Sequence, residues 1–493
     1  MPSLPSPSSS ATRCIPELIA QGEASHLPLT SSSFASYLDE HDVLSPVREE
    51  FDIPGTGERE IYFCAHALGA MPKRVPQLLA EEVESWRETG APGHSHLKNP
   101  NGKPWTAGHP SGGVDERYTD VMADLIADGR MHVLLAIVGA LPEEVTWMGS
   151  LTSDLHHLLN AFYRPNRNGR YKILYEGNAF PSDRFAFHSQ AQLAGLDPCD
   201  ALIGLLPRQG EDTLRTSDIL ATIEEQGNTI ALIIFGAVHW ETGQWLDMET
   251  ITRAGKEKGC VVGWDCAHAA GNVPMSLHDW GVDFAVWCTY KYLTSGPGST
   301  AGVFVHEKHF DLPRQAGWWG HELSSRFVYA PGFKPRTGAA GFTVSNPSVF
   351  GTVPVHASMQ VFDSIASLTG RPRKEVIGLV RAKSILLTGY LEYLLAIANS
   401  QTDNRISLHV LSPVDPIDRG SCLSFRVKDL SASDLQDQSR YSAALVEFCA
   451  KLEKNGVTVD KRAPDLVRLA PSALYNTFEE AWRLGAAIRE ALM

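Results

Sequence analysis

Short apolar runs alternate with helical patterns through the middle of the chain. From residue 171 onward, the apolar runs are nearly continuous, which is typical of strands buried on both faces of a sheet. Between them lie amphipathic stretches such as Ser217–Gln226, whose apolar residues recur at helical spacing. Strands that alternate with helices are typical of parallel βαβ units. The pattern predicts strands at Tyr171–Tyr175, Thr229–Phe235, Cys260–Trp264, Phe284–Cys288 and Thr300–His306.

The alternation ends at two stretches rich in Pro and Gly, residues 329–341 and 345–354. A long helical pattern follows at Val355–Ile397, and the C-terminal part mixes both element types. We therefore expect the α/β class, with a large, mostly parallel-sheet domain at 46–354 and a smaller C-terminal α+β domain at 355–493. Residues 1–45 are expected to form an N-terminal tail and arm. The C-terminal pattern predicts strands at Cys422–Val427 and Asp465–Ala470 and helices at Ser433–Asn455 and Phe478–Leu492.

Composition and charge narrow the function classes. The 493 residues are 43% hydrophobic and 20% charged, as in a compact protein with a large core. The net charge of −14 argues against a nucleic-acid partner, because binding to a phosphate backbone requires a basic face. Apolar runs such as Ile230–Phe235 are too short to cross a bilayer. The Ser- and Pro-rich start, Met1–Ala11, lacks the features of a secretory signal, and we expect it to be a disordered tail. The eight cysteines are scattered without a CxxC pair, so we expect a reduced, cytoplasmic setting and no metal site.

An acid and a lysine follow neighbouring predicted strands. Asp265 ends one of them, His268 comes three residues later, and Lys291 follows the next strand. Because ligands collect at the carboxyl ends of parallel strands, we expect these side chains to converge. A lysine can form a Schiff base with pyridoxal phosphate (PLP), and a carboxylate facing the ring nitrogen keeps that nitrogen protonated. His268 would pack against the cofactor or bond it. The plainer interpretation is a surface lysine and an acid that caps a turn.

A phosphate site is expected beside such a cofactor. The segment Gly149–Asp154 opens a helical pattern, and the free N–H groups of a helix start favour an anion. The backbone N–H groups near Leu151 and Thr152, together with the Thr152 hydroxyl, are the candidate donors. An ordinary helix N-cap explains the same residues, and Asp154 would repel a phosphate.

Two further positions carry candidate chemistry. In the segment Phe180–Asp183, an aromatic ring could stack on a pyridine and two polar groups could bond it. A core phenylalanine followed by a turn is the alternative. Arg468 is a cation in an otherwise apolar predicted strand and therefore needs a carboxylate partner. That partner is either a substrate or an internal salt bridge.

Long blocks of the chain closely resemble kynureninases, over nearly everything from about residue 46 to the end. The blocks are Phe235–Gln244, Leu277–Asp283, Tyr290–Leu293, Gly317–Ser324, Gly341–Pro347, Leu386–Leu394 and Asp460–Arg462. The resemblance implies a fold-type I PLP-dependent enzyme that acts as a homodimer. It further implies hydrolysis of L-kynurenine, or its 3-hydroxy form, to an anthranilate and L-alanine.

The resemblance also assigns roles to residues. Lys291 would form the Schiff base and shuttle a proton, Asp265 would face the ring nitrogen, and Tyr290 would be an acid or base near the phosphate. Arg468 would hold the substrate carboxylate, and His94, His321 and His66 would lie on the substrate side. The cofactor site would be lined by Leu151, Thr152, Phe180, Pro181, Ser182, Asp183, Asp265, His268, Tyr290, Lys291, Trp318 and Asn346, some of them across the dimer interface, with Asn346 also near the substrate.

Four positions depart from the family pattern. His66 and Ala67 stand where the family has an Asn-Ser pair, Asp154 replaces an asparagine, and Gly236 replaces a serine. Losing a hydrogen-bond donor and adding a negative charge would weaken cofactor binding by on the order of a few kcal/mol unless a cation compensates. These changes suggest retuning toward a modified kynurenine or a related β-acyl amino acid.

Two rival functions remain open at this stage. An Asp-x-x-His motif followed by a Schiff-base lysine also occurs in related transaminases and cysteine desulfurases. A desulfurase needs a mobile nucleophilic cysteine, but Cys422 lies in an apolar run where a buried, inert thiol is expected. A binding or scaffold protein without activity is the second alternative. The joint presence of Asp265, His268, Lys291 and Arg468 argues against it.

Overall fold

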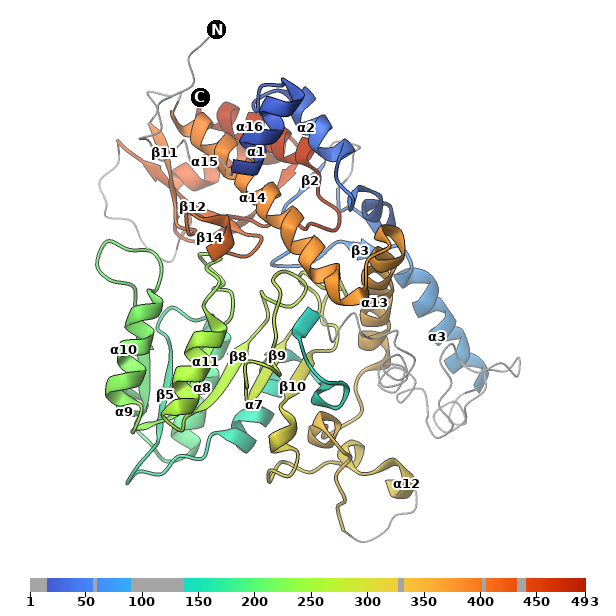
Figure 1. The fold of residues 1–493 in the computed structure, drawn as a ribbon, viewed down its shortest axis with the longest axis vertical. Coiled ribbons are helices and arrows are strands. Elements are labelled where there is room, and N and C mark those ends of the chain that lie inside the picture. Colours follow the sequence, from blue (N-terminus) through green and yellow to red (C-terminus); the bar gives the residue numbers. More distant parts are fainter. Residues whose placement is uncertain (1–15, 56–59, 90–136, 327–331, 401–404, 432–439) are drawn as a thin grey trace. The chain divides into compact units, whose positions relative to one another are not determined.

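The structure is a computed structural model that describes residues 16–55, 60–89, 137–326, 332–400, 405–431 and 440–493 (Figure 1). It divides into two compact units. The first combines residues 1–70, 241–244 and 378–493, and the second combines residues 71–240 and 245–377. The expected tail Met1–Ala11 and His94 lie outside the described residues. No helix in the described ranges is long and apolar enough to cross a membrane.

The second unit is built on a seven-stranded sheet in the order β4-β10-β9-β8-β7-β5-β6. The strands β6, β5, β7, β8 and β9 run parallel to one another, whereas β10 pairs antiparallel with both β9 and β4. The sheet is therefore mostly parallel, as predicted, and the strand predicted at Thr300–His306 is the one that pairs antiparallel on both sides. The strands are β4 (Val145–Trp147), β5 (Lys172–Glu176), β6 (Leu202–Leu205), β7 (Ile230–Gly236), β8 (Val261–Asp265), β9 (Phe284–Trp287) and β10 (Gly302–Val305).

Helices cover this sheet because its strands are apolar on both faces. Leu232 and Ile234 belong to the core that also contains the apolar residues of α7 and α8. Ile233 points the other way, toward Gly255 of α11, where an added Cβ would lie 2.7 Å from the Ile233 side chain. The helices are α7 (Leu151–Phe162), α8 (Pro181–Leu193), α9 (Pro198–Ala201), α10 (Thr216–Gln226) and α11 (Met248–Glu257) (Figure 1).

The long helical pattern predicted at Val355–Ile397 is two helices. The first, α13 (Val349–Thr369), ends at Gly370, which has φ +65°. The second, α14 (Val376–Ser400), begins after Pro372. A left-handed glycine followed by a proline stops a helix, since proline lacks the N–H that would continue it. Helix α3 (Val75–Thr89) packs against α13 in the same unit.

The first unit is an α+β assembly around the antiparallel sheet β11-β12-β15-β14. Its core joins apolar residues of α14, α15 and α16 to the sheet and to α1 and α2 near the N-terminus. The helix expected at Ser433–Asn455 begins only at Ala443 in the described part, where the Ser442 hydroxyl accepts the N–H of Leu445. The elements are α1 (Pro16–Ser25), α2 (Ser32–Glu40), β2 (Ile61–Tyr62), β11 (Ile406–Val410), β12 (Leu423–Asp429), α15 (Ala443–Lys454), β13 (Val457–Thr458), β14 (Asp460–Arg462), β15 (Leu466–Leu469) and α16 (Phe478–Leu492).

The units differ in extent from the domains expected at 46–354 and 355–493. Residues up to 70 belong with the C-terminal part because β2 pairs in parallel with β13 and α2 packs on α16. The other border falls at residues 377–378, just after the turn between α13 and α14. The first feature has no local sequence signal, since it depends on contacts between distant segments.

Candidate active site

A pocket opens at the carboxyl ends of the parallel strands in the second unit. Glu176, Gly236 and Asp265 are the last residues of β5, β7 and β8. Tyr290 and Lys291 follow β9, so five positions converge at one edge of the sheet. The open space at this pocket, including the part that is continuous with solvent, is about 520 Å³. Its walls are Leu151, Thr152, Glu176, Phe180, Ser182, Asp183, Gly236, Val238, Trp240, Asp265, Ala267, His268, Tyr290 and Lys291.

Most of the residues proposed from the sequence to surround the cofactor meet here. The pocket also contains Glu176, Val238, Trp240 and Ala267, which sequence reasoning missed. Glu176 had a detectable signal, because it ends a predicted strand in the same way as Asp265 does. Trp240 had none, since it lies in the loop after β7 and its ring contacts Phe180 with centroids 5.8 Å apart.

Phe180 and Lys291 face one another across the pocket. The Lys291 Nζ lies 5.9 Å from the centroid of the Phe180 ring. Phe180 is not the core residue of the alternative interpretation, because it is 43% exposed and precedes α8 as its N-cap residue. Trp240 packs against Phe180, and its indole N–H donates to the Asn178 carbonyl at 2.8 Å. The site thus offers an aromatic ring and an amine with space between them.

Three carboxyl groups are buried in the same pocket. Burial raises the pKa of Glu176 to about 8, although the Gly236 N–H donates to it at 2.8 Å. Burial, followed by the negative charge of Asp265, raises the pKa of Asp183 well above its usual range. The Asp183 Oδ1 and Glu176 Oε2 atoms are buried without a hydrogen-bond partner among the described residues. Such a surplus of buried acid indicates that the site accommodates a cationic group.

PLP fits this donor set at both of its ends. Asp265 would keep a pyridine nitrogen protonated, and this positive charge would balance the buried acids. At the other wall, the Thr152 and Ser182 hydroxyls are 2.8 Å apart and come from the first turns of α7 and α8. Helix N-termini and hydroxyls are suited to an anion such as phosphate. The residues present therefore fit the expected cofactor.

The Asp154 carboxyl group is not free to act on the proposed phosphate donors. Its side chain is fully buried in the first turn of α7 and accepts the Gly149 N–H at 3.0 Å. Burial raises the pKa of this carboxyl to about 7, against which the bonds from Gly149 and Ser153 act. The concern that Asp154 repels phosphate is therefore reduced near and below neutral pH, where a large part of this carboxyl is protonated.

The glycine at position 236 leaves room for Glu176. A Cβ at Gly236 would lie 2.9 Å from the Glu176 Oε1 atom. A serine there, as in the family pattern, requires the Glu176 carboxyl to shift. The glycine therefore removes a hydroxyl donor but gives the buried carboxyl a direct bond to the backbone N–H of residue 236.

Other proposed site residues of the second unit lie outside the lining of this pocket. Trp318 is 50% exposed, Asn346 is also exposed, and Pro181 starts α8 beside the lining residues. His321 is buried, and both ring nitrogens are engaged within its own segment. The Lys334 N–H donates to Nδ1 at 3.0 Å, and Nε2 lies 2.9 Å from the Ser325 hydroxyl.

Arg468 and His66 meet in the first unit. Arg468 is 3% exposed and donates from Nε to Asp460 Oδ2 at 2.8 Å. Arg468 therefore forms the internal salt bridge that was one of the two alternatives for its partner, with Asp460 as the carboxylate. His66 Nε2 lies 3.7 Å from the same carboxylate oxygen. As expected, Cys422 is buried, and its pKa is raised by burial.

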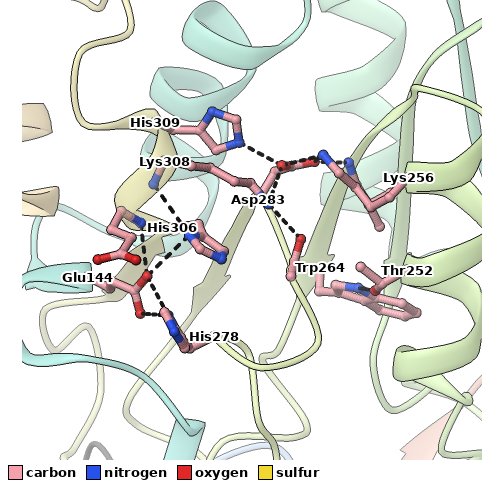
Figure 2. A network of polar contacts seen from close by, with 12 residues as sticks. Glu144, Thr252, Lys256, Trp264, His278, Asp283, His306, Lys308 and His309 are labelled. Carbon is pink, nitrogen blue, oxygen red and sulfur yellow. Dashed lines mark hydrogen bonds and ion pairs between the residues drawn. The ribbon is translucent and has the colours of Figure 1, made fainter.

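A second polar network of the second unit has the composition of a metal site (Figure 2). One atom each of Glu144, His278 and His306 lies within 4.8 Å of the others. The Glu144 carboxylate, however, already accepts the N–H groups of Leu141 and Glu307, both at 2.9 Å, and bonds His278 at 3.0 Å. Hydrogen bonds within the protein therefore account for this cluster.

The other half of that network surrounds Asp283, which is fully buried (Figure 2). Lys256 and His309 contact its carboxylate at 2.6 Å, and Lys308 lies 3.2 Å away. Burial alone would raise the pKa of Asp283, but the bond from His309 and the two lysine charges lower it below its usual range. Asp283 also accepts the Val262 N–H of β8 at 2.8 Å. This ion cluster anchors β8, which carries Asp265.

Comparisons with known proteins assign both parts of the chain. Residues 380–488 match the family described as kynureninase C-terminal domain, and residues 122–309 match aminotransferase class-V. Kynureninase from Nematostella vectensis is 41% identical over 491 residues, which covers 95% of this chain and 96% of that protein. Kynureninase from Mus musculus is 41% identical over 472 residues, which covers 92% of each.

Solved structures with low sequence identity share the fold. A cysteine desulfurase from Thermococcus onnurineus is 16% identical and superimposes with a TM-score of 0.65, covering 91% of this chain and 97% of that one. A C-DES mutant with glycine covalently linked to its PLP cofactor gives the same TM-score at 17% identity, covering 90% and 99%. The predicted fold-type I architecture is thereby confirmed. Together with the full-length similarity to curated relatives, these findings establish that the chain belongs to the kynureninase family.

Proposed function

We propose that this chain hydrolyses L-kynurenine or 3-hydroxy-L-kynurenine to the corresponding anthranilate and L-alanine, with PLP bound through Lys291. The observation that carries the proposal is the convergence of Lys291, Asp265 and Phe180 in one pocket of the second unit, in a chain of this family.

Each residue of the pocket has a task in this reaction. When bound, PLP supplies the electron sink that stabilises charge at the substrate α-carbon. Lys291 would hold the cofactor, and its amine would move the α-carbon proton of the substrate. Asp265 keeps the ring nitrogen protonated, with its Oδ1 held by the Ala267 N–H at 2.7 Å. Phe180 and His268 pack around the ring.

Tyr290 acts as a proton donor in this proposal. Burial, followed by the neighbouring Cys288, raises the pKa of its hydroxyl far above neutral. The phenol therefore keeps its proton at working pH and can donate it to the carbonyl side of the substrate. Leu151, Thr152 and Ser182 hold the phosphate through the helix starts they occupy.

By the family resemblance, Arg468 is proposed to bind the substrate carboxylate, and His66, His94, His321 and Asn346 are proposed to recognise the substrate. The chain acts as a homodimer in the cytoplasm. The exposed Trp318 and Asn346, which do not line the pocket of their own chain, support a contribution to the partner's site. Net charge and the described helices are consistent with a small-molecule substrate rather than a nucleic acid or a membrane.

The direct test is to incubate the PLP-loaded protein with each kynurenine and measure alanine and anthranilate release. We expect both products to be released in equal amounts. In Lys291→Ala the rate of release should fall steeply. A matched control is Lys172→Ala, which removes a lysine of the same unit outside the pocket. Retained PLP binding without alanine release from either substrate would refute the proposed reaction. It would favour a related β-acyl amino acid as substrate, in line with the changes at His66 and Gly236. Conversion of PLP to its amine form would instead favour transaminase chemistry.

A further inference from the structure

Glu176 is a carboxyl group in the wall of the pocket that the sequence did not single out. It is the last residue of β5, which lies beside β7 in the sheet. In the next pair of strands, Gly236 at the end of β7 is directly opposite Asp265 at the end of β8. Glu176 is 4% exposed and lines the pocket. Its carboxyl group is therefore buried in the protein and also borders the space that fits the cofactor.

The two oxygens of this carboxyl group have different surroundings. Oε1 accepts the Gly236 N–H at 2.8 Å, which fixes one half of the group to β7. Oε2 is buried and has no hydrogen-bond partner among the described residues. A buried polar atom that lacks a partner is costly and requires an explanation. Because Glu176 lines the pocket, a bound molecule is the expected partner of Oε2.

The glycine at position 236 makes this arrangement possible. A Cβ at Gly236 would lie 2.9 Å from the Glu176 Oε1 atom, so a larger residue would push the carboxyl group away from the backbone N–H. Position 236 is also one of the four places where the chain departs from the family pattern, which has a serine there. This chain thus lacks a hydroxyl at the pocket wall and holds a carboxyl group against the same position instead.

Glu176 carries a proton at neutral pH. Burial raises its pKa to about 8, against which the bond from Gly236 acts, and the negative charge of Asp265 raises it further. In the described lining of the pocket, Lys291 is the one lysine or arginine beside three carboxyl groups. A third negative charge in this space would have no counter-charge. The protonated group offers an O–H donor, which an ionised carboxylate does not have.

The other charged and titratable groups around Glu176 come from neighbouring elements. Arg184 of α8 is exposed and acts on Tyr175 of β5. Asp154 of α7 lies outside the pocket lining and titrates near pH 7. The groups within the lining are Asp183 of α8, Asp265 and His268 at and after β8, and Tyr290 and Lys291 after β9. All of them are present both in the wild-type protein and in a variant of Glu176, so a comparison of the two proteins isolates the contribution of Glu176.

We propose that Glu176 is a further cofactor-binding residue of this chain, a neutral carboxylic acid that Gly236 holds in place and that donates a hydrogen bond from Oε2 to an oxygen of the bound PLP. The phosphate and ring oxygens of PLP are anionic acceptors, which form strong bonds with such a donor. The inference goes beyond the proposed function, because it concerns the binding of PLP and not the bond that is broken. Its consequence is that the affinity for PLP decreases when Glu176 loses its proton.

The test is the affinity of the cofactor-free, full-length protein for PLP between pH 6.5 and 9.5, measured by equilibrium dialysis for wild type and Glu176→Gln. The glutamine amide can accept the Gly236 N–H and donate from its nitrogen, but it has no proton to lose. The two proteins should bind PLP about equally at pH 6.5. Above pH 8, the affinity of wild type should fall relative to that of the variant by up to about tenfold per pH unit.

The sign of this difference is decisive. A wild-type affinity that rises relative to Glu176→Gln with increasing pH would mean that a charged Glu176 faces the ring nitrogen, and it would overturn the inference. An equal pH dependence of the two proteins would overturn it as well. If the wild-type protein binds no PLP at any pH, the assignment of the cofactor fails together with this inference, which is a distinguishable result.

Infrared difference spectra provide a readout that does not depend on affinity. The wild-type protein should show the carbonyl band of a protonated carboxyl group that is absent in Glu176→Gln. This band should shift when PLP is added, because the Oε2–H group then gains its acceptor. A missing band, or a band that PLP does not shift, would contradict the proposed bond.

A second variant probes the same contact from the other side. Gly236→Ala places a Cβ 2.9 Å from Oε1, which is the end of a flexible side chain and can move, so the protein should fold with the carboxyl group displaced. Its affinity for PLP at pH 7 should be lower by about tenfold or more, with a flatter pH dependence. Glu224→Gln, which removes an exposed carboxylate of α10, is the matched control and should behave as wild type. An unchanged affinity in Gly236→Ala would overturn the inference even if Glu176→Gln did not fold.

Discussion

The buried Asp154 predicts an unusual dependence of stability on pH. In the unfolded chain this carboxyl has its ordinary pKa of 3.8, whereas burial in the first turn of α7 raises it to about 7. The folded protein therefore binds more protons than the unfolded chain between these two values. Its stability falls as pH rises through this window and levels off above about pH 8. Replacing Asp154 with asparagine removes this dependence and keeps an oxygen for the Gly149 N–H.

The size of the effect follows from the two pKa values. One pKa unit corresponds to about 1.4 kcal/mol, so the group destabilises the folded state by about 2 kcal/mol at pH 5 and about 4 kcal/mol at pH 8. The protein without PLP should therefore lose about 2 to 3 kcal/mol of unfolding free energy over this range because of Asp154 alone. Asp154→Asn should not show that loss. Above pH 7 the variant should also bind PLP more tightly, because it lacks a negative charge near the phosphate donors.

Urea unfolding of both proteins without cofactor, followed by circular dichroism at pH 5, 6, 7 and 8, measures the difference. The exposed aspartate variant Asp279→Asn is the control, since it removes a charge without changing a buried site. Parallel stability curves for wild type and Asp154→Asn over this range would show that the carboxyl is not buried as described. A PLP titration at pH 6 and pH 8.5 then tests the second expectation.

Three further predictions concern the sheet that carries the pocket. Asp265→Asn should keep the fold but lower the rate of alanine release by at least about a hundredfold, because an amide does not hold a proton on the ring nitrogen. Steady-state kinetics measure this rate, and an unchanged rate would contradict the assignment. Asp283→Asn should destabilise the protein by about 3 kcal/mol, since it leaves two lysines without their buried partner, and thermal unfolding would reveal it. Gly263→Ala should lower the unfolding temperature as well, because its Cβ would lie 2.3 Å from the Phe284 ring; an unchanged temperature would mean that β8 and β9 can move apart.

Local patterns predicted the centre of the fold well. The strands β5, β7, β8 and β9 are buried on both faces, so each leaves an apolar run that is visible without any structure. The direction of β10 was not predictable in this way, because the apolar pattern of a strand is the same in parallel and antiparallel pairing. Gly370 and Pro372 did mark the break between α13 and α14, but the continuous helical spacing on either side obscured it.

The site residues that could be predicted are those that follow a strand and carry a side chain with a role in the expected chemistry. Asp265 and Lys291 follow that rule, and Glu176 follows it equally, one residue beyond the predicted strand. The protonation of Asp154 could not be predicted, since it depends on burial in three dimensions. Nor could the contact between His66 and Asp460, which are almost four hundred positions apart and are brought together by the pairing of β2 with β13.

The pairing of β2 with β13 also orders events during synthesis. Ile61 and Tyr62 leave the ribosome early, but their partners Val457 and Thr458 are among the last residues made. The second unit has its whole sequence available by residue 377 and can begin to fold while the first unit still lacks half of its core. Closing so long a loop is slow, and the waiting apolar residues of α1 and α2 are exposed meanwhile. A nascent chain that stops short of residue 468 can therefore complete the PLP pocket yet lack the Asp460–Arg468 pair.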